Sequence, residues 1–306
     1  MTSNDCPWLR GCATALVTPF SSGGAVDEAG LRRLVEYQVE NGVKLIVPCG
    51  TTGESATTSE EEDRRIIEVV IAQARGRARV IAGTGSNSTK SAVEYTRAAR
   101  QLGADAVLVV APYYNKPTQA GLLAHFSAVA ESAGDLPVML YNVPGRTACN
   151  LSAASTLELA RRHQNVVAVK EASGDLAQIM AILKDRPPGF RVFSGDDAVT
   201  FALMAMGADG VVSVASNEAP ALMSRLCELC LAGEWESARR LHFSLLPLME
   251  ANFIESSPAP VKAALEMMGL IDGRLRLPLV SVQESTRRRL ADVLGELGLL
   301  RAGSSR

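Results

Sequence analysis

Lys170 is the residue of this sequence whose position most suggests chemistry. Four apolar residues, 166–169, lead into it, and a Ser-Gly-Asp stretch typical of a helix start follows shortly after. This pattern predicts a short buried strand that ends in a cation. Burial is costly for an ammonium group and favours the neutral amine, which can attack a ketone and form a Schiff base. The structural alternative, the commoner role of a lone lysine after a strand, is an ion pair with Glu171 or another acid.

Side chains that can move protons or bind anions follow other predicted strands: Thr51, Thr52, Tyr113, Tyr114, Tyr141 and Arg146. Phenols can relay protons, hydroxyls flanked by glycines suit a carboxylate, and a guanidinium suits a second anion. Taken singly, each has an ordinary alternative role in a turn, an interface or the surface. Together with an amine nucleophile they predict a Schiff-base lyase or aldolase that acts on an α-keto acid.

Metal chemistry is not expected. The three histidines lie in helical patterns away from predicted strand ends, and the sequence has no His-x-His or His-Glu-x-x-His motif: His125, His163 and His242. A metal-dependent aldolase is therefore disfavoured. Asp196-Asp197 is predicted to cap a helix, and Cys227 and Cys230 are predicted to be two small buried side chains on one helix face.

The elements that position these residues alternate regularly. Eight short apolar segments alternate with helical patterns, at about residues 11–17, 44–47, 79–82, 105–110, 137–140, 166–169, 191–193 and 210–214. This alternation predicts a parallel sheet closed into a (β/α)8 TIM barrel, in which chemistry lies at the carboxyl ends of the strands. A doubly wound sheet is the weaker alternative, because no G-x-G-x-x-G turn follows the first strand.

The strands stop after about residue 219. Four helical patterns follow, at about residues 222–231, 235–254, 261–268 and 285–300. We therefore expect a barrel over residues 1–218 and a C-terminal helical subdomain over residues 219–306. Helix starts are marked by Asp27 and by a capping box of Ser59 and Glu62.

Composition describes an ordinary globular protein. The chain has 306 residues, of which 47% are hydrophobic and 21% charged, and its net charge is −2. No basic stretch suggests nucleic-acid binding. The N-terminal residues lack the pattern of a signal peptide, and no apolar run is long enough for a membrane span, so a cytoplasmic protein without membrane contact is expected.

Five motifs resemble a known family when they are taken in this order: Gly50-Thr51-Thr52-Gly53-Glu54-Ser55, Pro112-Tyr113-Tyr114-Asn115-Lys116-Pro117, Tyr141-Asn142-Val143-Pro144-Gly145-Arg146-Thr147, Lys170-Glu171-Ala172-Ser173-Gly174 and Ser194-Gly195-Asp196-Asp197. From about residue 11 to 300 the chain resembles the dihydrodipicolinate synthases, which belong to the pyruvate-dependent lyases. Arg146 after the Tyr-Asn-Val-Pro segment favours a synthase over N-acetylneuraminate lyase and the sugar-acid aldolases.

The resemblance implies a catalytic set of four residues. Lys170 would form the Schiff base with pyruvate, and Tyr141 would relay protons during imine formation and cyclisation. Thr51 would link Tyr141 to Tyr114, which would arrive from the neighbouring subunit of a tight dimer. A homotetramer, built as a dimer of dimers, is implied, with neither a metal nor an organic cofactor.

The resemblance also implies how substrates are held. Thr52 would hold the pyruvate carboxylate, and Arg146 would receive the carboxylate of aspartate semialdehyde. Gly195 and Val212 match positions whose backbone lines the pocket near the lysine. The expected reaction is the condensation that gives 4-hydroxy-tetrahydrodipicolinate in lysine biosynthesis. Two alternatives stay open, namely a related pyruvate-dependent aldolase with another aldehyde and a non-catalytic barrel that senses a keto acid.

A possible regulatory cleft departs from the family pattern. Four residues that match the lysine-binding cleft of inhibited members are kept: Ser55, Ala56, Asn87 and Tyr113. Many such members carry histidines where this chain has Glu60 and Asp63, and a glutamate where it has Ser91. Because these changes alter the charge of the cleft and remove an anion that would hold an ammonium group, we expect weak or absent inhibition by lysine.

Overall fold

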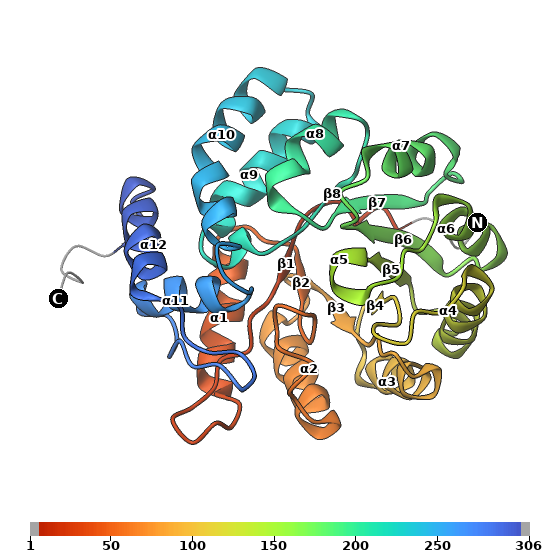
Figure 1. Ribbon diagram of the computed structural model, residues 1–306, viewed down its shortest axis with the longest axis horizontal. Helices are drawn as coiled ribbons and strands as arrows, with labels where there is room; N and C mark the ends of the chain where they lie inside the picture. Colours follow the sequence, from red (N-terminus) through yellow and green to blue (C-terminus); the bar gives the residue numbers. More distant parts are fainter. Residues whose placement is uncertain (1–5, 301–306) are drawn as a thin grey trace.

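Eight parallel strands close into a barrel in the order of the sequence, β1 to β8 (Figure 1). The computed structural model describes residues 6–300. The strands are β1 (Gly11–Ala15), β2 (Leu45–Val47), β3 (Arg79–Gly83), β4 (Ala106–Val110), β5 (Val138–Asn142), β6 (Val166–Glu171), β7 (Arg191–Ser194) and β8 (Gly210–Ser213). Since β1 pairs with β8, the sheet has no free edge, and the predicted (β/α)8 barrel is confirmed.

Helices surround the barrel and continue beyond its last strand (Figure 1). Those interleaved with the strands are α1 (Glu28–Glu40), α2 (Glu60–Ala74), α3 (Thr89–Leu102), α4 (Gln119–Ala133), α5 (Pro144–Thr147), α6 (Ala153–Arg162), α7 (Leu176–Asp185), η1 (Asp197–Val199) and α8 (Thr200–Ala205). Those after β8 are η2 (Ala215–Asn217), α9 (Pro220–Leu231), α10 (Trp235–Ala251), α11 (Ala259–Met267) and α12 (Glu284–Glu296). The predicted C-terminal helical extension is therefore confirmed.

Local signals start the helices where the sequence predicts. The Ser59 side chain accepts a hydrogen bond from the Glu62 backbone, and the Glu62 side chain accepts one from the Ser59 backbone, which confirms the capping box of α2. Asp27 caps α1 with its side chain alone, which accepts a hydrogen bond from the backbone N–H of Gly30.

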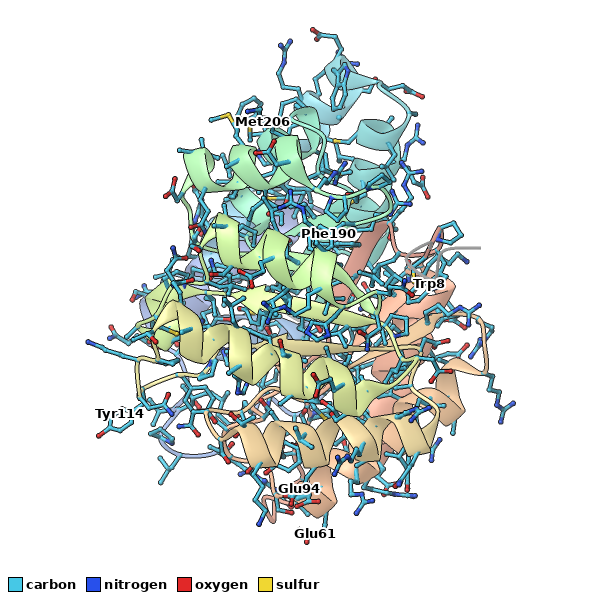
Figure 2. The ribbon with its side chains drawn as sticks, turned by 90° about the vertical axis from the view of Figure 1, so that its right-hand side faces the viewer. Trp8, Glu61, Glu94, Tyr114, Phe190 and Met206 are labelled. Atoms are coloured by element: carbon cyan, nitrogen blue, oxygen red, sulfur yellow. The ribbon has the colours of Figure 1, made fainter. Side chains whose placement is uncertain are left out.

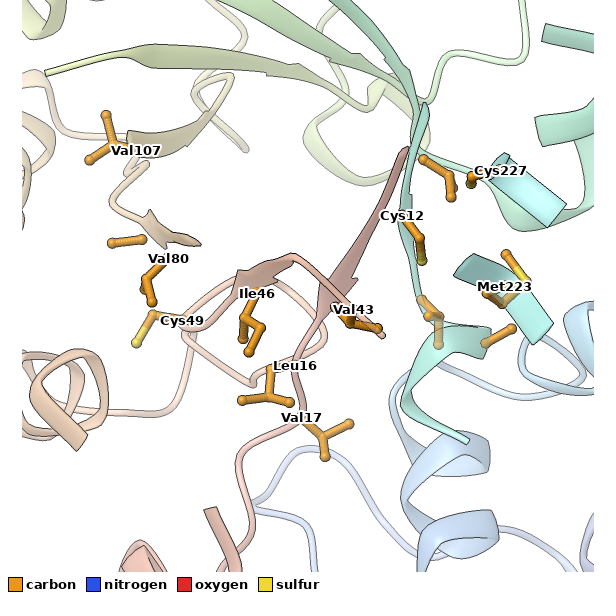
Figure 3. Packing of buried hydrophobic residues seen from close by; sticks show 14 of the residues in the cluster. Cys12, Leu16, Val17, Val43, Ile46, Cys49, Val80, Val107, Met223 and Cys227 are labelled. Atoms are coloured by element: carbon orange, nitrogen blue, oxygen red, sulfur yellow. The ribbon is translucent and has the colours of Figure 1, made fainter. Parts of the chain in front are cut away.

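The apolar residues form an inner and an outer layer of core. The inner cluster fills the barrel, whereas the larger outer cluster lies between the strands and the helices. In the outer layer Cys12 of β1 faces Cys227 and Met223 of α9 (Figure 3). The helix after β8 therefore packs on the barrel itself, and packing continues across residue 218. The domain boundary at that residue stays a prediction.

Strands β5 and β6 extend further than the sequence predicts. Each continues for two residues past its apolar segment, so that Tyr141 lies opposite Lys170 and Asn142 lies opposite Glu171 in the sheet register. Successive residues of a strand point to opposite faces of the sheet, and at these strand ends the residues on both faces are polar. A search for apolar segments therefore places the end of each strand too early. Within residues 6–300, no helix is both long enough and apolar enough to cross a lipid bilayer.

Candidate active site

Lys170 and Tyr141 face one another inside the barrel. Their side chains come from paired positions of β5 and β6, and both residues are only 6% exposed. Lys170 Nζ lies 4.2 Å from the centroid of the Tyr141 ring. No carboxylate within residues 6–300 lies within ion-pair distance of this amine. The amine is thus buried beside a phenol ring and has no fixed anion, as a nucleophilic amine requires.

The structural alternative for Lys170, an ion pair with Glu171, does not form. Successive residues of a strand point to opposite faces, so the Glu171 side chain points away from the barrel interior. Its carboxylate accepts hydrogen bonds from Asn142 Nδ2 at 3.2 Å, Ser173 N at 2.8 Å and Gln178 Nε2 at 3.2 Å. Glu171 is therefore satisfied by amide groups behind the strands.

A cavity of about 160 Å³ lies over the Lys170 amine. Six of the residues that the sequence singled out line it: Thr51, Thr52, Tyr141, Arg146, Lys170 and Gly195. Six further residues line it to which the sequence assigned no role in substrate binding: Val143, Ala172, Asp196, Val214, Phe253 and Ser257. Val143, Ala172 and Asp196 lie within the motifs that resemble the family, and Val214 ends the predicted strand 210–214, whereas Phe253 and Ser257 lie between α10 and α11. The volume suits a substrate of a few non-hydrogen atoms.

Gly195 is required by the lysine. A Cβ atom at this position would lie 3.0 Å from Lys170 Cε and 2.6 Å from the Cβ of Ala172. Since real side chains do not tolerate such approaches, any larger residue would displace the lysine or the strand beside it. Val212, by contrast, is buried one layer deeper in the inner core, and Val214 is the residue after β8 that lines the cavity. A substrate-binding role for Val212 stays a prediction.

Arg146 supplies positive charge at the edge of the cavity. It lies on α5, the single helical turn after β5, and its side chain is exposed. No acid within the described residues pairs with it. An arginine placed in this way can bind a substrate carboxylate through two parallel hydrogen bonds.

Tyr114 does not reach this cavity within one chain. It is 87% exposed, and it projects from the edge of the molecule opposite to Trp8 (Figure 2). Its backbone has a φ of 76°, which is unusual for a residue other than glycine, and its N–H donates to Thr147 O at 3.2 Å. The predicted link from Tyr141 through Thr51 to Tyr114 therefore needs a second copy of the chain.

A second cavity, of about 440 Å³, adjoins the first and shares Thr51, Val143 and Arg146 with it. Its lining includes three residues of the predicted regulatory cleft and both acids that depart from the family pattern: Ser55, Ala56, Tyr113, Glu60 and Asp63. The fourth predicted residue, Asn87, is not part of the lining, although its carbonyl accepts a hydrogen bond from Asn115. Burial raises the pKa of Asp63 to about 6, even though Thr58 Oγ1 donates to its carboxylate at 2.6 Å.

The two aspartates after β7 have separate structural roles. Asp196 caps the 3-10 turn η1, as predicted. Asp197 accepts hydrogen bonds from the backbone N–H groups of Val214 and Ala215, both at 2.9 Å, and it thereby orders the chain after β8. Burial raises the pKa of Asp197. Among residues 6–300, no three His, Cys, Asp or Glu side chains form a set that could hold a metal ion.

The comparisons with known proteins agree with this geometry. Residues 8–297 match the model of the "Dihydrodipicolinate synthetase family". The 4-hydroxy-tetrahydrodipicolinate synthase of Koribacter versatilis is 49% identical over 294 residues, which are 96% of this chain and 97% of that protein.

Two solved structures are also similar. A structure described as the first monomeric dihydrodipicolinate synthase variant is 44% identical, has a TM-score of 0.93, and covers 96% of this chain and 98% of its own. The lysine-bound enzyme from Cyanidioschyzon merolae is 44% identical, has a TM-score of 0.93, and covers 96% of this chain and 99% of its own. With a family match over nearly its whole length and a lysine amine in the barrel cavity, this chain belongs to the dihydrodipicolinate synthetase family.

Proposed function

We propose that this protein is a Schiff-base lyase that condenses pyruvate with L-aspartate 4-semialdehyde to give 4-hydroxy-tetrahydrodipicolinate. The observation that carries the proposal is the Lys170 amine, which is buried without an acidic partner against the Tyr141 ring. The family match and the relative from Koribacter versatilis, which bears the name of this activity, support the same substrates.

The first half of the reaction joins pyruvate to the enzyme. The neutral Lys170 amine attacks the keto carbon of pyruvate, and a proton delivered to the former carbonyl oxygen lets it leave as water, which creates a C=N bond. The Tyr141 hydroxyl, on the ring beside the amine, is the group that moves these protons. Thr52 is buried in the cavity wall and supplies a hydroxyl for the pyruvate carboxylate.

The second half forms the new carbon–carbon bond. Loss of a methyl proton turns the imine into an enamine, whose terminal carbon attacks the aldehyde carbon of the second substrate. The amine of that substrate then displaces Lys170 from the imine carbon, which closes the ring and frees the enzyme. Arg146 lies at the edge of the cavity, where its guanidinium can hold the carboxylate of the semialdehyde.

We further propose a homo-oligomer in which a second copy brings Tyr114 to the site. The exposed side chain and the unusual backbone of Tyr114 support this role, because a large aromatic residue held in such a conformation suits a contact with a partner. A homotetramer built as a dimer of dimers is the predicted assembly. Size measurement by analytical ultracentrifugation tests it, and a monomer with full activity would contradict it.

A cytoplasmic location remains the prediction made from the N-terminal sequence.

We also propose that lysine inhibits this enzyme weakly or not at all. The second cavity presents Glu60 and Asp63, and Ser91 supplies no anion where inhibited members carry a glutamate. Of the relatives, the Cyanidioschyzon merolae enzyme is described as binding lysine. A steady-state assay across lysine concentrations tests this proposal, and a sub-millimolar inhibition constant would contradict it.

The decisive experiment for the proposed function is reduction with borohydride in the presence of pyruvate. Mass spectrometry of the digested protein should then find the reduced pyruvate adduct on Lys170. Absence of the adduct would refute every Schiff-base function, including that of a related aldolase with another aldehyde. A coupled assay with aspartate semialdehyde, run beside sugar-acid aldehydes, identifies the second substrate. A non-catalytic barrel would turn over none of them.

A further inference from the structure

A buried ion pair joins two of the segments that line the active cavity. Lys262 Nζ donates to Glu54 Oε1 at 2.7 Å and to Thr18 O at 2.9 Å, and it lies 4.3 Å from the centroid of the Phe20 ring. Both charged side chains are 0% exposed. The partners are separated by 208 residues in the sequence, so the contact exists only in the folded barrel.

The Glu54 carboxylate is held on both of its oxygens. Oε2 accepts a hydrogen bond from the Arg276 backbone N–H at 3.0 Å. The Arg276 guanidinium donates to both oxygens of Glu62, at 2.5 and 2.7 Å, and to the carbonyl of Thr57 at 2.8 Å. The turn after β2 is thereby fixed from its interior by Lys262 and from its outer side by Arg276.

The position of the pair relates it to the site. Glu54 belongs to the turn that carries Thr51 and Thr52, and its backbone has a φ of 58°, an uncommon conformation that its surroundings stabilise. Lys262 lies in the first turn of α11, directly after the segment whose residues Phe253 and Ser257 line the cavity. Movement of either partner would displace one of the two segments relative to the other.

We propose that the Glu54–Lys262 ion pair positions the Thr51–Thr52 turn for the carboxylate of the keto acid. Both are positioning residues, since neither lines the cavity. The inference rests on the proposed function, because it assumes that Lys170 binds a keto acid. A hydroxyl displaced by about 1 Å would weaken binding of the acid while leaving the amine able to react.

The test measures the pyruvate concentration that gives half-maximal borohydride labelling of Lys170. Lys262→Met and the charge-neutral double variant Glu54→Gln/Lys262→Met are compared with wild type, well below the melting temperature of each. Asp209→Asn is the control, because it removes a buried carboxylate from its ion pairs with the part-exposed Arg186 and Arg191 near the amino end of β8, outside the cavity lining. We expect the pyruvate concentration for half-maximal labelling to rise roughly tenfold or more in both Lys262 variants. In the control it should change by less than about twofold.

The outcomes separate the two proposals. Wild-type protein that is never labelled refutes the proposed function itself. Labelling of wild type with unchanged half-saturation in the Lys262 variants overturns the positioning role only. If Lys262→Met does not fold, the double variant answers the question, since it leaves no unpaired buried charge. A wild-type half-saturation in the double variant, or an equal rise in Asp209→Asn, would assign the pair to stability alone.

Discussion

Two of the six lysines in this chain are buried, and they differ in the hydrogen-bond acceptors around the amine. Lys170 and Lys262 each lie over an aromatic ring, with Nζ 4.2 Å from the Tyr141 centroid and 4.3 Å from the Phe20 centroid. Lys262 also has a carboxylate at 2.7 Å, whereas Lys170 has a cavity in its place. The ring contact is common to both, so the Glu54 carboxylate and the Thr18 carbonyl distinguish Lys262 from Lys170, the amine that we propose reacts.

The paired lysine shows what the anion does. Burial lowers the pKa of Lys262, and the Glu54 carboxylate opposes that change by stabilising the ammonium. An amine held as a cation, with its hydrogens donated to Glu54 and Thr18, is a poor nucleophile. In the cavity no such acceptor holds Lys170, so its amine is available to a ketone. Within the described residues, Lys170 has no acid beside it because Glu171, the next residue of β6, points to the opposite face of the sheet.

The largest expected effect comes from removing the reactive amine. Lys170→Met should lower turnover by roughly 10⁴-fold or more and abolish borohydride labelling, because no other group can form the imine. Its free energy of unfolding should change by no more than about 1 kcal/mol, since no anion is left unpaired. Turnover assays and urea unfolding measure the two quantities. A large loss of stability would break the contrast with Lys262.

Removing the paired amine of Lys262 should, in contrast, cause a large loss of stability. Lys262→Met leaves Glu54 buried without its cation, which should lower the free energy of unfolding by about 3–5 kcal/mol. The double variant Glu54→Gln/Lys262→Met should recover most of that loss, because it buries no charge. Urea denaturation of both variants gives the values. Equal instability of the single and double variants would show that packing, rather than charge, dominates at this position.

The ring beside Lys170 can be separated from its hydroxyl. Tyr141→Phe keeps the aromatic contact with the amine but removes the proton-relaying group, and we expect turnover to fall by roughly 10²–10³-fold. Labelling of Lys170 should still occur, more slowly, because the nucleophile is intact. Rapid-quench labelling and steady-state assays distinguish the two effects. Unchanged turnover would remove Tyr141 from the proposed proton path.

Asp63 extends the comparison to a half-buried acid that has no cationic partner within residues 6–300. Its raised pKa of about 6, against 3.8 for a free aspartate, means that the folded state holds the proton more tightly. The resulting stabilisation is complete below pH 3.8 and is lost as the pH rises through about 6. The free energy of unfolding of Asp63→Asn, measured relative to wild type at the same pH, should therefore be about 1–3 kcal/mol higher at pH 8 than at pH 5. Urea unfolding at both pH values checks this, and a pH-independent difference would contradict it.

Local patterns in the sequence were sufficient for much of the site. The alternation of apolar strands and amphipathic helices identifies a barrel, and the barrel places the residues after each strand at one end. Lys170, Thr52 and Arg146 could therefore be chosen in advance. Phe253 and Ser257 could not, because they follow a helix rather than a strand, and no pattern within a segment shows which distant loop covers a cavity.

The sequence by itself determined the order of the elements, the lysine at the end of β6 and the family to which the chain is similar, because these depend on short-range periodicity and motifs. Only the tertiary structure decided which buried lysine has an acid beside it. Glu171 adjoins Lys170 in the chain but points away from it, whereas Glu54 is 208 residues from Lys262 and contacts it directly. Strand alternation and barrel closure set these directions, and neither can be derived from distance along the chain.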